Sequence, residues 1–236
     1  MNHEVSWLKM TELDLISSLE LAARIEEFGE GSAKPRGYPG YPTFALPRSK
    51  KRWFTGLDRT LVSRRCTSEP GRAFPDCRRL SRLLWLSHGV SGNDYRGPTP
   101  SAGGLQAIEL YLVNWQSTWL PAGVYHYGRR NHVLAQISQS AIEEEWRQCV
   151  PSLRSITGGA VLWLIAGDSR RVEAKYGERS DRFLLLEAGH LMQNLCLVSA
   201  SLNLTTVPLG GVLEQEVSVR LTLPPTDHVL YAGICG

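Results

Sequence analysis

The most apolar window of the chain, residues 183–202, constrains its fold more than any other feature. The spacing predicts one long helix over 180–202, apolar nearly all round, with Ser180 or Asp181 as its N-cap. A thin polar stripe interrupts the apolar residues, formed by Glu187, His190, Gln193 and Asn194. Moving these groups into a lipid bilayer would be costly. We therefore expect a central core helix whose polar stripe makes interior hydrogen bonds, and no membrane span.

Helices and strands alternate along the rest of the chain, which predicts an α+β or α/β class. Hydrophobic periodicity and turn residues place the elements. The expected strands are 108–115, 122–128, 159–167, 204–212 and 228–236; the expected helices are 6–28, 76–88 and 140–150. Ser140 is expected to open the last of these helices, and Asp168 to cap a short helix that leads to Lys175.

The N-terminal residues 1–45 are expected to form a unit of their own, a helical arm followed by a linker. Residues 31–47 contain several prolines and glycines, so we expect no regular element there. The main domain is placed at 46–236.

Composition constrains the function less. The 236 residues include 26 basic and 23 acidic side chains, which favours no nucleic-acid partner. Basic residues gather within 48–82, and this cluster fits a solvated face, a phosphate site or a nucleic-acid surface. Five scattered cysteines without a C-x-x-C motif predict neither a disulfide framework nor a structural zinc site. The N-terminus lacks the apolar core of a signal peptide, so we expect a soluble, cytoplasmic protein.

Three loops have the composition of ligand-binding turns. In 63–72, two adjacent arginines stand beside hydroxyl side chains, a combination that suits phosphate. In 100–104 and 207–212, paired glycines let a ligand approach the backbone closely. Taken alone, each loop also fits an ordinary surface turn, bulge or hairpin.

Lys175 and Tyr176 come shortly before the long helix. Taken alone, they fit an exposed pair at a helix entry. A lysine beside an apolar ligand can also act as a base, so acid–base chemistry is the alternative. His190, taken alone, fits a hydrogen-bonded core histidine better than a catalyst.

The order of these segments is more specific than any one of them. The chain contains, in this order, "RRCTSEPGRAF", "LSRLLWLSHG", "PSAGGLQAIELYLV", "LPAGVYHYGRRNHVL", "KYGERSDRFLLLEAGHLMQNLCLVSASLNL" and "VPLGGV". Over residues 46–236 it resembles the SagB-type thiazole/oxazole (azoline) dehydrogenases, a branch of the flavin-dependent nitroreductase superfamily.

The resemblance implies an α+β nitroreductase-like fold, with a central, mostly antiparallel sheet flanked by helices, and an intertwined homodimer with FMN at its interface. Lys175 and Tyr176 would be the catalytic pair. The implied FMN-binding residues are Arg64 and Arg65 at the phosphate and ribityl chain, Ser101, Ala102, Gly103 and Gly104 along the flavin, and Leu209, Gly210 and Gly211 near flavin N5.

Two positions of the phosphate loop depart from the family pattern. Cys66 stands where serine is frequent, and Ser68 stands where a further arginine is common. Arg72 or Lys51 would then supply the missing positive charge at the FMN phosphate.

The implied reaction is the aromatisation of a thiazoline or oxazoline in a peptide or carrier-bound intermediate, with Lys175 taking a proton and the flavin a hydride. A cyclodehydratase or a peptide synthetase would be the partner. Two alternatives remain: an NAD(P)H-dependent nitro- or quinone reductase or other flavin oxidase, and a flavin-less scaffold subunit of a biosynthetic complex.

Overall fold

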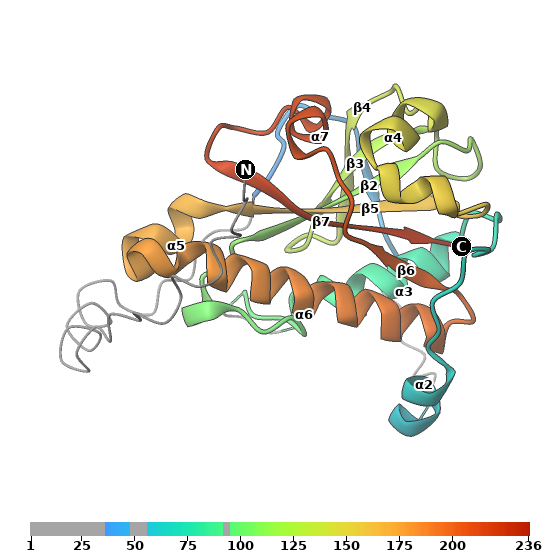
Figure 1. Cartoon of the computed structure of the whole chain (residues 1–236), viewed down its shortest axis with the longest axis horizontal. Coiled ribbons are helices and arrows are strands. Elements are labelled where there is room, and N and C mark those ends of the chain that lie inside the picture. Colours follow the sequence, from blue (N-terminus) through green and yellow to red (C-terminus); the bar gives the residue numbers. More distant parts are fainter. Residues whose placement is uncertain (1–35, 48–55, 92–94) are drawn as a thin grey trace, which may run out of the picture.

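The residues that the structure describes, 36–47, 56–91 and 95–236, fold around one seven-stranded sheet (Figure 1). This structure is a computed structural model. The strand order is β1-β4-β3-β2-β5-β7-β6, and all neighbouring strands are antiparallel. The strands are β1 (Thr43–Ala45), β2 (Ile108–Asn114), β3 (Gly123–Gly128), β4 (Val133–Ser138), β5 (Val161–Asp168), β6 (Thr206–Leu209) and β7 (Asp227–Cys235).

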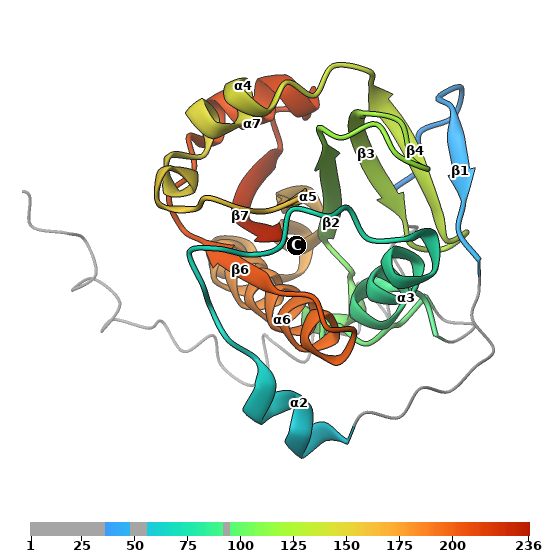
Figure 2. The same ribbon diagram turned by 90° about the vertical axis from the view of Figure 1, so that its right-hand side faces the viewer.

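Helices cover both faces of the sheet, so the fold has three layers (Figures 1 and 2). The helices α3 and α6 pack on one face, and α4 and α7 pack on the other. The helices are α2 (Leu57–Ser63), α3 (Cys77–His88), α4 (Glu143–Cys149), α5 (Ser169–Tyr176), α6 (Ser180–Ser201) and α7 (Glu214–Leu221), with 3-10 turns η2 (Ala102–Gly104), η3 (Pro151–Ser155) and η4 (Gly177–Arg179). The expected α+β class and antiparallel sheet are confirmed.

The predicted core helix is confirmed as α6. Its buried stripe follows the helical repeat and packs against the sheet and α3; it includes Leu184, Ala188, Leu191, Leu195 and Cys196. The opposite side leaves Leu185 and Leu186 more than half exposed. By length and composition, Ser169–Ser201 is the one segment of the described chain that could cross a membrane. Its packing is that of a core helix.

The polar stripe of α6 was predicted only in part. Glu187 is buried and Asn194 donates hydrogen bonds to the Ser87 carbonyl and the Thr99 hydroxyl, but His190 and Gln193 are exposed. The interior-bonding prediction is wrong for these two, because they lie on the helix face turned away from the sheet. The helix cap also differs: Arg179 occupies the N-cap position, and the Ser180 hydroxyl donates to the Gly177 carbonyl.

Most other predicted elements are present with shifted ends. The helix over 76–88 is confirmed, and Asp76 caps it by accepting hydrogen bonds from two backbone N–H groups. Ser140 does not open α4, whose N-cap position is Ile142. Asp168 occupies the N-cap of α5, but its carboxylate pairs with arginines instead of capping.

Sequence patterns missed the shorter elements. No strand was expected at β4, and α2 and α7 are too short to show a clear helical period. The expectation of no regular element in 31–47 is wrong, because β1 pairs with β4 there. The predicted arm helix at 6–28 lies outside the described residues.

Candidate active site

The 101–106 turn lies directly against α5. Gly103 and Gly104 have left-handed φ angles of 57° and 70°, a conformation that glycine adopts readily. A β-carbon at Gly103 would lie 2.6 Å from Oη of Tyr176 and 2.9 Å from Nζ of Lys175. The polar ends of both catalytic candidates therefore converge on one glycine, and the fold brings together two segments that are far apart in the sequence.

Lys175 is buried in this arrangement, with 6% of its surface exposed. Its Nζ atom lies 5.8 Å from the centre of the Tyr176 ring, within the range of a cation–π contact. The Tyr176 ring packs on Phe183, with ring centres 4.4 Å apart, and burial raises the pKa of its hydroxyl. The interpretation of an exposed lysine at a helix entry is therefore wrong.

Gln106 closes the turn. Its backbone N–H donates a hydrogen bond of 2.7 Å to the Ser101 hydroxyl, and its carbonyl accepts one of 2.7 Å from Nη1 of Arg171. Its side-chain oxygen accepts a further bond from Arg129. Gln106 is buried with a positive φ of 53°, a strained state for a non-glycine residue that persists only when its surroundings enforce it. Sequence reasoning missed this residue, because a glutamine has no motif that marks it.

Glu187 reaches the same region from α6. It is 2% exposed, and neither carboxylate oxygen makes a hydrogen bond of normal geometry to the described residues. Burial raises the pKa of Glu187 to about 7, although the nearby Ser101 hydroxyl and the charge of Arg129 lower it in part. A carboxyl group that titrates near neutral pH therefore lies beside the turn.

A buried charge network lies behind the turn, on the sheet face that α4 and α7 partly cover. We define it as Arg36, Glu109, His126, Asp168, Arg171 and Asp227. Burial opposes ionisation of Glu109, but a hydrogen bond from His126 and the charges of Arg171 and Arg36 outweigh it and hold its pKa at about 2. No sequence motif marks this network, whose members come from five separate segments.

The segment before β1 completes the network. Nη1 of Arg36 lies 2.5 Å from Oδ2 of Asp227, and the Tyr38 and Tyr111 hydroxyls are 2.8 Å apart. Asp227 has a fully buried side chain, so Arg36 supplies the charge that it needs.

The predicted phosphate loop is far more open. The Cys66 sulfur accepts a hydrogen bond of 3.5 Å from Nη1 of the half-buried Arg64. Arg65 is exposed and donates to the carbonyls of Val62 and its own neighbour. Ser68 is exposed, and its carbonyl accepts from the N–H of Thr157.

Arg72 and Lys51 were the two residues expected to supply the missing positive charge at the phosphate, and the structure describes only the first of them. Arg72 donates to the Thr157 carbonyl. Lys51 lies outside the described residues.

The third loop follows β6, which ends at Leu209. A β-carbon at Gly210 would meet no atom within 4 Å, so the backbone is open there. The N–H of Gly211 instead donates a hydrogen bond of 2.8 Å to the Ser152 hydroxyl. Contact of this loop with flavin N5 stays a prediction, and Gly210 is its accessible position.

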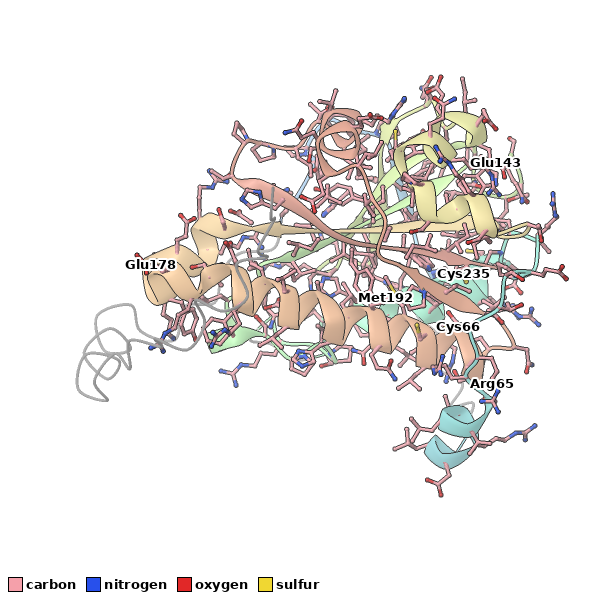
Figure 3. The ribbon with its side chains drawn as sticks, in the orientation of Figure 1. Arg65, Cys66, Glu143, Glu178, Met192 and Cys235 are labelled. Carbon is pink, nitrogen blue, oxygen red and sulfur yellow. The ribbon has the colours of Figure 1, made fainter. Side chains whose placement is uncertain are left out.

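Two groups of predicted site residues lie at opposite ends of α6 (Figure 3): the turn at 101–104 with Lys175 and Tyr176, and the phosphate loop. Figure 3 shows Glu178, two residues beyond Tyr176, at one end, and Arg65 and Cys66 at the other. The Cys66 side chain lies near Cys196, close to the C-terminal end of α6. From Ser180 to Cys196 the helix rises by roughly 24 Å. One chain therefore does not gather both groups around a single small ligand.

Residues 78–236 match the model of the Nitroreductase family. The chain belongs to the nitroreductase family. The matched part of the chain includes the 101–106 turn, Lys175, Tyr176 and the loop after β6, whereas the phosphate loop precedes it.

Two curated relatives show what kinds of protein are similar. A nitroreductase of Methanocaldococcus jannaschii is 29% identical over 163 residues, which cover 68% of this chain and 81% of that protein. The trifolitoxin-processing protein TfxB of Rhizobium leguminosarum bv. trifolii is 30% identical over 142 residues, or 58% of this chain. The match covers only 38% of TfxB.

Solved structures share the fold. A nitroreductase of Ralstonia eutropha superposes with a TM-score of 0.73 and 21% identity, covering 86% of this chain and 93% of that one. The Escherichia coli microcin synthetase McbBCD complex with truncated pro-MccB17 bound contains a chain with a TM-score of 0.62 and 20% identity, covering 97% of this chain and 85% of that one.

Nitroreductase-family proteins generally bind FMN, and the described residues of this chain fit such a ligand. Gly103 has an exposed backbone, and Gly210 has open space beside it. Among the described residues, the Arg64 guanidinium makes one long hydrogen bond to sulfur, which leaves donors for a phosphate. The open glycine backbones suit a flat ring, and the Arg64 guanidinium suits an anionic tail. Gly103 and Arg64 lie at opposite ends of α6 (Figure 3).

Proposed function

We propose that this nitroreductase-family chain is an FMN-dependent dehydrogenase that aromatises a thiazoline or oxazoline in a peptide or carrier-bound intermediate. One observation carries the proposal. Nζ of the buried Lys175 and Oη of Tyr176 converge on the backbone of Gly103, in the turn assigned to the flavin. A positioned proton acceptor beside a flavin-lining turn is what ring dehydrogenation needs.

The chemistry divides between the cofactor and the chain. Aromatisation breaks two C–H bonds and forms one double bond: one ring carbon gives up a proton, and its neighbour gives up a hydride with the electron pair. When bound, FMN supplies the hydride acceptor. Lys175 accepts the proton at Nζ, and the Tyr176 hydroxyl orients the ring by a hydrogen bond. Burial of Lys175 keeps bulk water away from the proton transfer.

The separation of the two residue groups supports the proposed homodimer. In a complete site, Arg64, Arg65, Cys66 and Ser68 of one chain would hold the phosphate and ribityl chain. Ser101–Gly104 and Lys175 of the other chain would face the flavin ring. Leu209, Gly210 and Gly211 are proposed to approach N5. Each dimer would then contain two sites.

The similarity to a trifolitoxin-processing protein and to a chain of a microcin synthetase complex supports a modified peptide as substrate. The proposed partner is accordingly a cyclodehydratase, with a peptide synthetase as the counterpart for a carrier-bound substrate. In either case the chain would act as one component of a biosynthetic complex.

A second function is favoured by the Methanocaldococcus relative, which is described as a nitroreductase. In that function, NAD(P)H reduces the flavin and a nitro compound or quinone reoxidises it. Lys175 would then matter little, because no ring proton is removed.

The test uses purified, FMN-loaded protein and a thiazoline-bearing peptide, with the product followed by mass spectrometry. We expect the wild type to remove two hydrogen atoms, and Lys175→Ala to lose roughly 10²- to 10⁴-fold in turnover, the usual contribution of a general base. Glu173→Ala, an exposed change on the same helix, is the matched control.

No mass change with the wild type, or equal turnover in Lys175→Ala and Glu173→Ala, overturns the proposal. NADPH-driven reduction of a quinone that survives Lys175→Ala would establish the second function instead. A colourless protein that takes up no added FMN would identify a scaffold subunit.

A further inference from the structure

We infer that Arg171 is a positioning residue that holds Lys175 in place against the 101–106 turn. The inference rests on the proposed function for the role of Lys175, but the placement itself is a property of this chain. Arg171 lies four residues before Lys175 on α5, so both side chains lie on the same side of the helix. The contacts of Arg171 therefore hold the part of α5 that carries Lys175.

All three guanidinium nitrogens of Arg171 are engaged. Nη1 donates to the Gln106 carbonyl at 2.7 Å, Nη2 lies 2.8 Å from Oε1 of Glu109, and Nε lies 3.3 Å from Oδ2 of Asp168. These partners belong to the turn, to β2 and to the end of β5. One planar group thus ties α5 to the turn and to two central strands, with a geometry that lysine cannot reproduce.

The partners of Arg171 are themselves fixed. Glu109 accepts a hydrogen bond of 2.8 Å from His126, and Arg36 lies within 4 Å of both Glu109 and Asp168. Arg171 is only 14% exposed, so water screens these charges weakly. The guanidinium is therefore held in one orientation.

The turn needs this support. Gln106 keeps a positive φ although it is not glycine, and its carbonyl points at Arg171. Without that bond, the backbone would relax, and the Ser101 hydroxyl would lose the N–H that it accepts. Gly103, on which Lys175 and Tyr176 converge, lies inside the same turn.

Arg170 provides a matched control. It is the preceding residue on the same helix and carries the same charge, but its side chain is 60% exposed and it makes a single 3.3 Å pair with Asp168. Arg170→Gln and Arg171→Gln therefore remove the same group from adjacent positions. Of the two arginines, only Arg171 contacts Gln106 and Glu109.

The first readout does not require catalysis. Lys175 is the only lysine within the described ranges, and it is buried. Labelling of the folded protein with an amine-reactive acetylating reagent, mapped by mass spectrometry, therefore reports on its placement. We expect Arg171→Gln to raise the labelling rate of Lys175 roughly 10-fold at a temperature well below unfolding. Arg170→Gln should match the wild type.

The second readout separates positioning from folding. With the azoline peptide, Arg171→Gln should lower kcat about 10- to 100-fold, as expected for a misplaced group, with KM changed less than about 3-fold. Arg171→Lys, which keeps the charge but not the planar group, should recover part of kcat. Circular dichroism confirms that each variant is folded.

The outcomes are distinct. If the wild type dehydrogenates nothing, the proposed function fails while labelling still decides the role of Arg171. If Lys175 labels at the wild-type rate in both Arg171→Gln and Arg171→Lys, the positioning role is overturned. The same holds if kcat falls equally in Arg170→Gln and Arg171→Gln.

Discussion

The two ends of α6 are built differently. At the N-terminal end, hydrogen bonds and an ion pair of Arg171 tie α5, which carries Lys175 and Tyr176, to the 101–106 turn and to the sheet. At the C-terminal end, the loop with Arg64 and Arg65 is largely exposed, and the side chains of these two arginines bond to nearby residues of the same loop and helix.

The difference indicates what each end does. Groups that transfer protons must be placed before the substrate arrives, so a rigid framework suits the end with Lys175. Groups that bind an anionic tail can adopt their final positions when the anion is bound, so open arginines suit the other end. Loss of a residue of the buried charge network should therefore lower the stability of the fold. Loss of Arg64 or Arg65 should instead weaken binding of the anionic ligand.

The largest expected effect on the free energy of unfolding comes from the buried charge network. Arg36→Ala would leave the fully buried Asp227 without its partner, and we expect a loss of about 3–5 kcal/mol in the free energy of unfolding. Arg170→Ala removes an exposed arginine whose partner Asp168 keeps Arg36 and Arg171, and should cost about 0–1 kcal/mol. Urea denaturation of both variants measures the difference; equal losses would show that Arg36 does not support the framework.

Glu187 makes the stability of this end depend on pH. Its pKa is raised from 4.5 to about 7 in the folded protein, so the folded state binds more protons between these values. The stabilising contribution of Glu187 is then complete below pH 4.5 and is lost as the pH rises through 7, by about 3 kcal/mol.

Glu187→Gln cannot ionise and should lack this fall. Denaturation of the variant and the wild type at several pH values gives the comparison, with the exposed Glu178→Gln as control. Parallel pH profiles for Glu187→Gln and the wild type would contradict the assigned ionisation.

The open end gives the smallest expected effect on the fold. Arg64→Ala removes one long hydrogen bond to sulfur, so thermal stability without FMN should hardly change. FMN affinity should fall about 10- to 100-fold, the equivalent of about 1.5–3 kcal/mol for a charged hydrogen bond. Fluorescence titration measures it, and Arg59→Ala, an exposed change on α2, is the control. Unchanged FMN affinity in Arg64→Ala would place the phosphate elsewhere.

Sequence patterns predicted the elements with strong periodicity or long apolar runs. The core helix and the buried strands β2 and β5 are of this kind, since each is a continuous run of mostly apolar residues. The closeness of Lys175 and Gly103 was implied only by resemblance to a family, because nothing local links residues so far apart.

The buried charge network and the conformation of the 101–106 turn could not be predicted in this way. Arg36 and Asp227 pair across almost the whole described chain, and Gln106 has a backbone conformation that its residue type disfavours. Such features depend on tertiary contacts that override local preference. They occur next to the candidate active site, where strain and buried charge are most expected.

The central claim is that the two ends of α6, from two different chains, form one dehydrogenase site. Arg64→Glu and Lys175→Ala should each be nearly inactive alone. In a dimer that contains one of each, the intact Arg64 end of one chain meets the intact Lys175 end of the other, which leaves one complete site.

Co-expression of the two variants, followed by the azoline assay, measures this directly. Random pairing should restore about a quarter of the wild-type activity, because half of the dimers are mixed and each has one of two sites intact. No activity in a preparation shown to contain mixed dimers would contradict the claim that the site is shared between chains.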